Sequence, residues 1–163
     1  MKKELDKTYN PKTFEDAVYE KWEKSELFNP DKLPFDTEKT YTISVPPPNA
    51  TGILHLGHAS MLSYQDILVR YHRMKGEKTL WLPGEDHAAL ATNAKIEKEL
   101  SKEGTSKHEL GREEFFKRVN AYVLDSRNTI RNQMKKIGSS LDWSRERYTL
   151  DEGLSRVVRI VFK

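Results

Sequence analysis

The stretch TYTISVPPPNATGILHLGH, residues 40–58, decides how this chain folds. Its first six residues alternate polar and apolar side chains with the two-residue period of a strand. The three prolines at 46–48 cannot continue a hydrogen-bonded ladder, so the strand ends there. A helical pattern begins near Leu56. The stretch therefore predicts a strand, a rigid turn and a helix N-terminus in immediate succession.

The start of this helix carries an unusual pair of side chains. His55 and His58 stand three residues apart, which places them on one side of the first turn. Gly57 lies between them and leaves room for a flat ring to approach the backbone. Because a helix N-terminus offers free N–H groups to phosphate oxygens, the residues predict a site for a nucleoside triphosphate. The alternative is a helix start whose histidines only cap or pack locally.

The rest of the chain predicts an α/β fold. We expect strands at residues 40–45 and 79–82, and helices at 14–26, 56–75, 88–102, 112–137 and from about 150 to the end. A strand, a helix and a second strand form a βαβ unit, which implies parallel strands and a right-handed crossover. Gly76 and Gly138 mark the ends of two of the helices.

Capping residues and apolar stripes support these helices. Possible capping boxes are Thr13 with Asp16, Ser106 with Glu109, and Thr149 with Glu152. Apolar stripes at helical spacing predict buried faces. The stripes comprise Phe14, Val18 and Trp22 in the first helix; Phe116, Val119, Val123, Ile130, Met134 and Ile137 in the long helix; and Val157, Ile160 and Val161 in the last. We expect Trp22, Trp81 and Trp143 to pack in or near the core.

Composition limits the class of protein. The chain has 163 residues, a net charge of +3, 33% charged and 36% hydrophobic residues, and no cysteine, which fits one soluble domain without disulfides or a cysteine zinc site. No apolar run reaches the length of a membrane span, and the first ten residues contain no hydrophobic leader. Between Arg127 and Arg147, six basic residues face two acidic ones. This surplus predicts either RNA-phosphate contacts or a solvated helix face.

Three segments together resemble a known family. The H-x-G-H pattern at residues 55–58 resembles the HIGH signature of class I aminoacyl-tRNA synthetases. PPPNATG at 46–52, LPGEDH at 82–87 and LDWSRER at 141–147 occur in the order typical of the valine-specific branch. The similarity runs from about Tyr9 to the last residue. Glu85, Ala89 and Asn93 depart from the residues that are usual there, which puts the detail of the pocket in doubt.

The resemblance implies the first half of a Rossmann-like doubly wound nucleotide-binding fold with parallel strands, preceded by an N-terminal helix and followed by long helices. It divides the chain into a helical extension and linker, residues 1–39, and a partial catalytic domain, residues 40–163. The last helix stops at Lys163 without a C-cap, and the lysine-rich KMSKS signature of the family is absent. We therefore expect a chain cut before the editing insertion.

The resemblance also implies roles for individual residues. His55 and His58 are the expected catalytic residues, donating hydrogen bonds to ATP phosphates and to the transition state. The expected ATP-binding residues are Thr51, His55, Gly57 and His58. The expected amino-acid-binding residues are Pro46, Pro47, Asn49 and Asp86, with the Asp86 carboxylate on the ammonium group. For Asp86 a helix N-cap is the rival interpretation.

The implied function is the segment of a valine–tRNA ligase that activates valine with ATP and transfers it to tRNA(Val). Mg²⁺ is expected on the ATP phosphates, with no metal bound by the protein alone. The expected partners are ATP, valine, tRNA(Val) and the missing half of the fold, in the cytoplasm. Two alternatives remain: a non-catalytic ATP- or RNA-binding fragment that is inactive without its missing half, and a nucleotidylyltransferase with the same histidine turn. The latter leaves the other segments unexplained.

Overall fold

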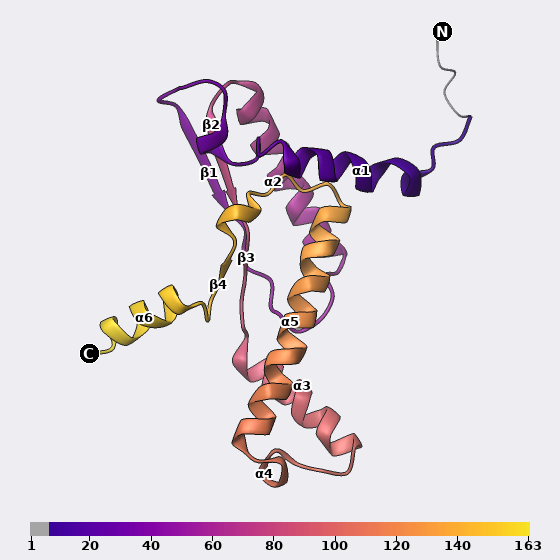
Figure 1. The fold of residues 1–163 in the computed structure, drawn as a ribbon, viewed down its shortest axis with the longest axis vertical. Helices are drawn as coiled ribbons and strands as arrows, with labels where there is room; N and C mark the ends of the chain where they lie inside the picture. The colour runs from indigo at the N-terminus through magenta and orange to yellow at the C-terminus, as the bar shows by residue number, and fades with distance from the viewer. Residues whose placement is uncertain (1–6) are drawn as a thin grey trace.

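The computed structural model describes residues 7–163, which form a mixed α/β structure (Figure 1). A small parallel sheet and its helix lie at one end, and a pair of long helices extends away from them. The elements in chain order are α1 (Pro11–Lys24), η1 (Pro30–Lys32), β1 (Thr40–Ser44), α2 (Leu56–Met74), β2 (Lys78–Leu82), β3 (Gly84–Glu85), α3 (Ala89–Lys102), α4 (Lys107–Leu110), α5 (Arg112–Lys136), η2 (Trp143–Arg145), β4 (Arg147–Tyr148) and α6 (Glu152–Val161).

The predicted strand–helix–strand unit is confirmed. β1 and β2 pair in parallel, with Thr40 opposite Lys78 and Ser44 opposite Leu82. α2 connects them and contacts both strands. The core is built where α2, β2 and the far end of α5 meet. Its buried members are Val45, Leu62, Val69, Trp81, Ile130, Met134 and Leu141.

The chain keeps its parallel pairing beyond the prolines. The Asp86 N–H donates to the Pro48 carbonyl (2.9 Å), and the Ala50 N–H donates to the Asp86 carbonyl (2.8 Å). On the other side of this segment, β3 pairs in parallel with β4. The segment that follows β2 therefore lies between the proline turn on one side and β4 on the other. Both of these neighbours are distant from it in sequence.

The first helix begins earlier than predicted, and its predicted capping box is wrong. The N-cap is Asn10, whose side chain accepts from the Lys12 N–H, and Pro11 occupies the first helical position, where its missing N–H costs nothing. Thr13 lies inside the helix and its hydroxyl donates to the Asn10 carbonyl. The predicted stripe is also only partly right, because Phe14 is 48% exposed and Tyr19 is the buried residue.

Tyr19 fixes α1 to the segment that follows α5. Its hydroxyl donates to the Ser139 carbonyl (2.7 Å) and accepts from Trp143 Nε1 (2.9 Å). Burial raises the pKa of Tyr19 to about 12, so the hydroxyl keeps its proton. Trp81 is fully buried, whereas Trp22, which is part of α1, and Trp143 are partly exposed.

The long helices agree with the sequence prediction. The capping box of Ser106 and Glu109 is present and starts the short α4. Gly111, with a φ of +81°, separates α4 from α5. Val123, Ile130 and Met134 are buried as predicted, whereas Phe116, near the first turn of α5, and Ile137, at its C-cap, are exposed. α3 packs along the first part of α5, and the pair forms the long arm of the molecule (Figure 1).

The last helix differs from the prediction at its cap and on its apolar side. Asp151 is the N-cap and accepts from the Leu154 N–H (2.8 Å). Thr149 lies before the helix, so the predicted box of Thr149 with Glu152 is wrong. Among the described residues, Val157, Ile160 and Val161 are all exposed. Figure 1 shows α6 projecting away from the sheet.

Candidate functional site

The two histidines form the N-terminal cap of α2. The Gly57 N–H donates to His55 Nδ1 (3.1 Å), and the His55 N–H donates to His58 Nδ1 (3.3 Å). The arrangement is a reciprocal capping box. Two imidazole nitrogens accept the hydrogen bonds that a serine or threonine hydroxyl and a glutamate carboxylate accept in the usual box. The ring centroids lie 4.0 Å apart. The two histidines therefore cap the helix, and their rings also lie close together on one side of it.

These bonds determine where each neutral ring carries its proton. A ring nitrogen that accepts a hydrogen bond has no proton, so the proton of each neutral imidazole is on Nε2. Partial burial, with a smaller effect from neighbouring His55, lowers the pKa of His58. His58 is thus neutral near pH 7. Within residues 7–163 neither Nε2 has a hydrogen-bond partner, which leaves two N–H donors for an external acceptor.

Gly57 is required by the neighbouring histidine. A Cβ at this position would lie 2.9 Å from Cε1 of His55 and 3.1 Å from its Nδ1. In the structure the ring next to the Gly57 backbone is that of His55. The approach of a nucleotide ring to Gly57 stays a prediction. Any larger residue would displace the ring that caps the helix.

α3 and α5 hold the turn that leads to the histidines. Gln133 Oε1 accepts from the Leu54 N–H (2.8 Å), immediately before His55. The Thr51 carbonyl accepts from the Tyr122 hydroxyl (2.5 Å) and from Lys95 Nζ (3.2 Å). Sequence reasoning missed these three side chains, since none belongs to a recognisable motif and each acts across more than forty residues.

Asp86 lies beside the proline turn. Asn49 and Asp86 form a parallel bridge, so two of the predicted amino-acid-binding residues are neighbours. Pro46 and Pro47 are exposed, whereas Pro48 is buried. The Thr51 N–H donates to the Asn49 carbonyl (2.8 Å), which joins the predicted ATP side to the predicted amino-acid side. Within the described residues no hydrogen bond joins the His55 ring or the His58 ring to Asp86.

The Asp86 carboxylate is held through one oxygen. Oδ1 accepts from the Ala88 N–H and from the Thr149 hydroxyl, both at 3.1 Å. Asp86 is not the N-cap of α3, because that position is Ala88, which has a left-handed φ of +43°. The Asp86 side chain is 40% exposed. In the part of the chain that the structure describes, Oδ2 has no hydrogen-bond partner and is available to a ligand.

Glu85, next to Asp86 in the chain, is buried in a cluster of charged side chains. Its side chain is only 3% exposed and contacts Arg127 (3.3 Å). Glu146 contacts both Arg127 and Arg131, the latter through two hydrogen bonds. Burial and the nearby charge of Glu146 raise the pKa of Glu85 to about 7, against the opposing effect of the two arginines.

The basic surplus between Arg127 and Arg147 is largely used within the protein. Each of its six basic residues forms an ion pair with a carboxylate. The pairs are Arg127 with Glu85 and Glu146, Arg131 with Glu146, Lys135 with Glu23, Lys136 with Asp16, Arg145 with Asp31 and Asp142, and Arg147 with Asp151. These ion pairs account for the basic surplus within the protein, and the RNA-contact interpretation stays a prediction.

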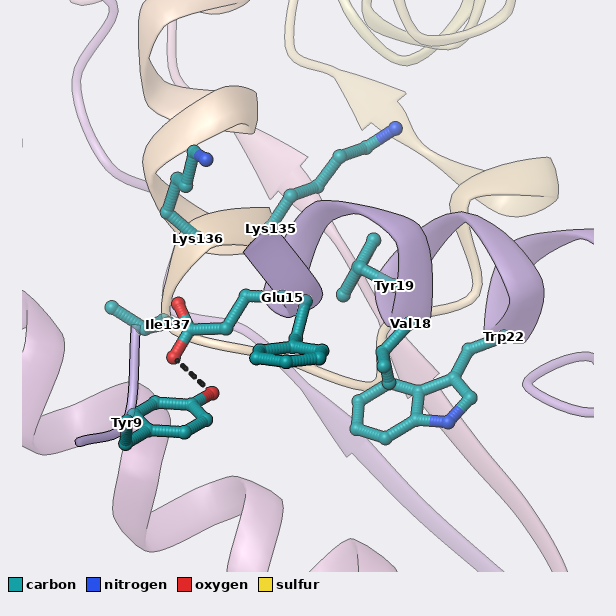
Figure 2. Close-up of a pocket in the computed structure, with 10 residues that line it drawn as sticks. Tyr9, Glu15, Val18, Tyr19, Trp22, Lys135, Lys136 and Ile137 are labelled. Atoms are coloured by element: carbon teal, nitrogen blue, oxygen red, sulfur yellow. Dashed lines mark hydrogen bonds between the residues drawn. The ribbon is translucent and has the colours of Figure 1, made fainter. Parts of the chain in front are cut away.

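A separate cavity lies between α1 and the end of α5 (Figure 2). Its volume is about 260 Å³, and its walls include the aromatic rings of Tyr9, Phe14 and Trp22. The Tyr9 hydroxyl donates to Glu15 (3.1 Å), as the dashed line in Figure 2 marks. None of the predicted site residues lines this cavity, so it is distinct from the histidine turn.

Within residues 7–163, no group of three or more histidine, cysteine, aspartate or glutamate side chains is arranged to hold a metal ion. No helix in the same range is long and apolar enough to cross a membrane.

Comparison with known proteins places this geometry in a family. A profile described as tRNA synthetases class I (I, L, M and V) matches residues 17–163. The valine–tRNA ligase of Treponema denticola is 51% identical over 159 residues, which are 98% of this chain and 17% of the relative. The corresponding enzyme of Clostridium tetani is 53% identical over 156 residues, 96% of this chain and 18% of the relative.

A solved structure supports the fold. The LeuRS of Agrobacterium radiobacter K84, in a ternary complex with tRNA and LeuAMS, superposes with a TM-score of 0.74 over 95% of this chain and 17% of its own length. Its sequence is 21% identical, so it bears on the fold alone. The chain spans less than a fifth of the length of these three proteins. By its profile match and its relatives, the chain belongs to the class I tRNA synthetases of the isoleucine, leucine, methionine and valine group.

Proposed function

We propose that this chain is the segment of a valine–tRNA ligase that binds ATP and valine for amino-acid activation. The identity of about half of all residues to valine–tRNA ligases over nearly the whole chain carries this proposal. In the reaction, a valine carboxylate oxygen attacks the α-phosphate of ATP, the bond to pyrophosphate breaks, and valyl-adenylate forms. The activated valine is then transferred to tRNA(Val) by the longer protein.

The histidine pair is suited to stabilising negative charge on phosphate oxygens. Each ring carries an Nε2–H that no described residue uses, at a helix N-terminus. Such fixed donors lower the barrier when charge spreads over transferring phosphate oxygens. We assign His55 and His58 to the ATP phosphates and transition state, and Thr51 and Gly57 to the same ATP site. Mg²⁺ enters on the phosphates, where it neutralises charge between them.

Asp86 is suited to binding the ammonium group of valine. Its free Oδ2 and its position beside Asn49 support this assignment. We assign Pro46, Pro47 and Asn49 to the same amino-acid site, where rigid prolines lose little entropy on binding. A pocket that selects by shape distinguishes valine poorly from threonine, which is nearly isosteric. We therefore expect threonine to be activated as well by any chain without an editing site.

The fold that we propose is the first half of a Rossmann-like catalytic domain over residues 40–163, with residues 1–39 as a helical extension. Two features of the chain support a second half of this domain as its binding partner. Within the described residues β1 pairs only with β2, which leaves its other edge open. α2 also carries an exposed apolar row, Tyr64, Ile67, Tyr71 and Met74. The alternative, a non-catalytic fragment, predicts that this chain needs that half to act.

The deciding experiment is ATP–pyrophosphate exchange by the purified chain, with valine, threonine and isoleucine supplied separately. We expect exchange with valine, weaker exchange with threonine and none with isoleucine. A folded chain without any exchange would favour the fragment alternative, and exchange with isoleucine alone would contradict the assigned specificity.

A further inference from the structure

Thr149 links the Asp86 carboxylate to the adjacent histidine. Its Oγ1 lies 3.1 Å from Asp86 Oδ1, 2.5 Å from His87 Nδ1 and 2.8 Å from the His87 backbone nitrogen, which donates to it. The Thr149 N–H in turn donates to the Glu85 carbonyl (3.2 Å). One threonine at the end of β4 therefore contacts three consecutive residues of the Asp86 segment.

Counting protons gives these contacts a direction. A threonine hydroxyl has one proton and two lone pairs. One lone pair accepts the His87 backbone N–H. If the hydroxyl proton went to His87 Nδ1, the contact with Asp86 Oδ1 would be left without a proton. If the proton goes to Asp86, the second lone pair accepts a proton from His87 Nδ1, and every contact is satisfied.

We propose that Thr149 is a positioning residue that donates to Asp86 Oδ1 while it accepts from His87 Nδ1–H, and so directs the free Oδ2 of Asp86 at the ammonium group of the amino acid. This role rests on the proposed function of Asp86, whereas the proton arrangement does not. His87 then carries its proton on Nδ1, the opposite of His55 and His58, whose Nδ1 atoms accept.

The arrangement also explains why a hydroxyl follows β4. β4 pairs with β3, which brings residue 149 level with the chain just after Glu85. With the Ala88 N–H as the second donor, Oδ1 receives two hydrogen bonds, which fixes the plane of the carboxylate. A hydrogen bond to a charged group is about twice as strong as one between neutral groups.

The first test concerns the protons and needs no activity. Nitrogen NMR of the ¹⁵N-histidine-labelled chain distinguishes a ring nitrogen that carries a proton from one that does not. At a pH where the rings are neutral, we expect the His87 proton on Nδ1 and the His55 and His58 protons on Nε2. A His87 ring with its proton on Nε2 would overturn the arrangement.

The second test concerns function and compares Thr149→Val with Thr149→Ser. Valine has the shape of threonine without the hydroxyl, and serine keeps the hydroxyl. In valine-dependent exchange, we expect Thr149→Val to raise the KM for valine about tenfold or more, in line with the value of a charged hydrogen bond. The KM for ATP should stay the same, and Thr149→Ser should restore most of the valine affinity.

The outcomes separate the two proposals. A wild-type chain without exchange contradicts the proposed function of this chain, and the NMR measurement still decides the proton arrangement. Wild-type exchange with an unchanged valine KM in Thr149→Val overturns the positioning role. An equal loss for valine and ATP in both variants, together with a lower Tm, would show that Thr149 only supports the fold, which also overturns the proposal.

Discussion

The histidine turn is oriented by hydrogen bonds between near neighbours in the sequence, whereas the Asp86 segment is oriented by hydrogen bonds from a distant residue. The bonds that orient His55 and His58 span two or three residues. Those that orient Asp86 and His87 from Thr149 span 62 or 63 residues. A locally built site keeps its geometry wherever the helix forms, whereas a site built from distant segments exists only once the tertiary structure has formed. The four predictions below test this difference, beginning with the largest effect.

Replacing His55 by asparagine separates the capping role from the phosphate role. Asparagine is a good N-cap and can accept from the Gly57 N–H, but it has no counterpart of the outward Nε2–H. We expect exchange to fall about 10²- to 10³-fold, as for the loss of one transition-state donor, with the Tm nearly unchanged. His55→Ala, the matched control, should lose both activity and stability. Full exchange by the asparagine variant would show that the ring only caps.

Replacing Glu85 by glutamine tests the distant construction through its pH dependence. Since the folded pKa, about 7, lies above the ordinary value of 4.5, the unfolded chain ionises Glu85 first. The stability contributed by the protonated form is therefore complete below about pH 4.5 and is lost as the pH rises through 7. Glutamine cannot ionise. We expect the stability of Glu85→Gln relative to wild type to increase by roughly 1–3 kcal/mol between pH 5 and 8.

Chemical denaturation of both proteins across that range measures the effect. Glu99→Gln, an exposed change on α3, serves as the control and should show little pH-dependent difference. If the free energies of unfolding of Glu85→Gln and wild type change in parallel with pH, then Arg127 and Arg131 keep Glu85 ionised in the folded protein.

Gln133 is the test of how local the histidine turn is. Its Oε1 is the acceptor for the Leu54 N–H, so Gln133→Leu leaves that N–H without its partner. We expect a loss of about 1–2 kcal/mol in the free energy of unfolding and faster hydrogen exchange at Leu54. Asn132→Ala, an exposed change on the same helix, is the control. Unchanged protection at Leu54 would mean that the turn holds itself.

Gly57 provides the smallest and most local test. Alanine at this position would stabilise an ordinary helix by up to about 1 kcal/mol, but here its Cβ meets the His55 ring. We expect Gly57→Ala to give no gain in wild type and to give the gain in a His55→Ala background. A double-mutant cycle in thermal unfolding measures this coupling, and simple additivity would contradict the contact.

The sequence predicted those features whose cause is local. The alternation at residues 40–45, the helical period after Leu56 and the box of Ser106 with Glu109 each depend on neighbours in the chain, and all are confirmed. Caps were harder where two candidates competed. The cap of α1 is Asn10, which accepts from the Lys12 N–H, and not Thr13. The cap of α6 is Asp151, which accepts from the Leu154 N–H, and not Thr149.

The remaining features depend on tertiary structure. Phe14 and Val18 lie on a clear apolar stripe, yet α1 turns Tyr19 toward the core. No local pattern marks Gln133 as the acceptor for Leu54, since a polar residue on an amphipathic helix is ordinary. The sequence predicts Thr149 only as a helix cap, because its contact with Asp86 depends on the pairing of β3 with β4. The site roles of His55, His58 and Asp86 stay predictions until they are tested.

The bond from the Tyr19 hydroxyl to the Ser139 carbonyl has a consequence for biosynthesis. The two residues are 120 positions apart. At a translation rate of roughly 5–20 residues per second, about 6–24 s pass between the synthesis of Tyr19 and that of its acceptor, and longer before Ser139 leaves the ribosome. During this interval α1 has no docking place and its aromatic side is open to chaperones. The N-terminal helix is made early and docks late.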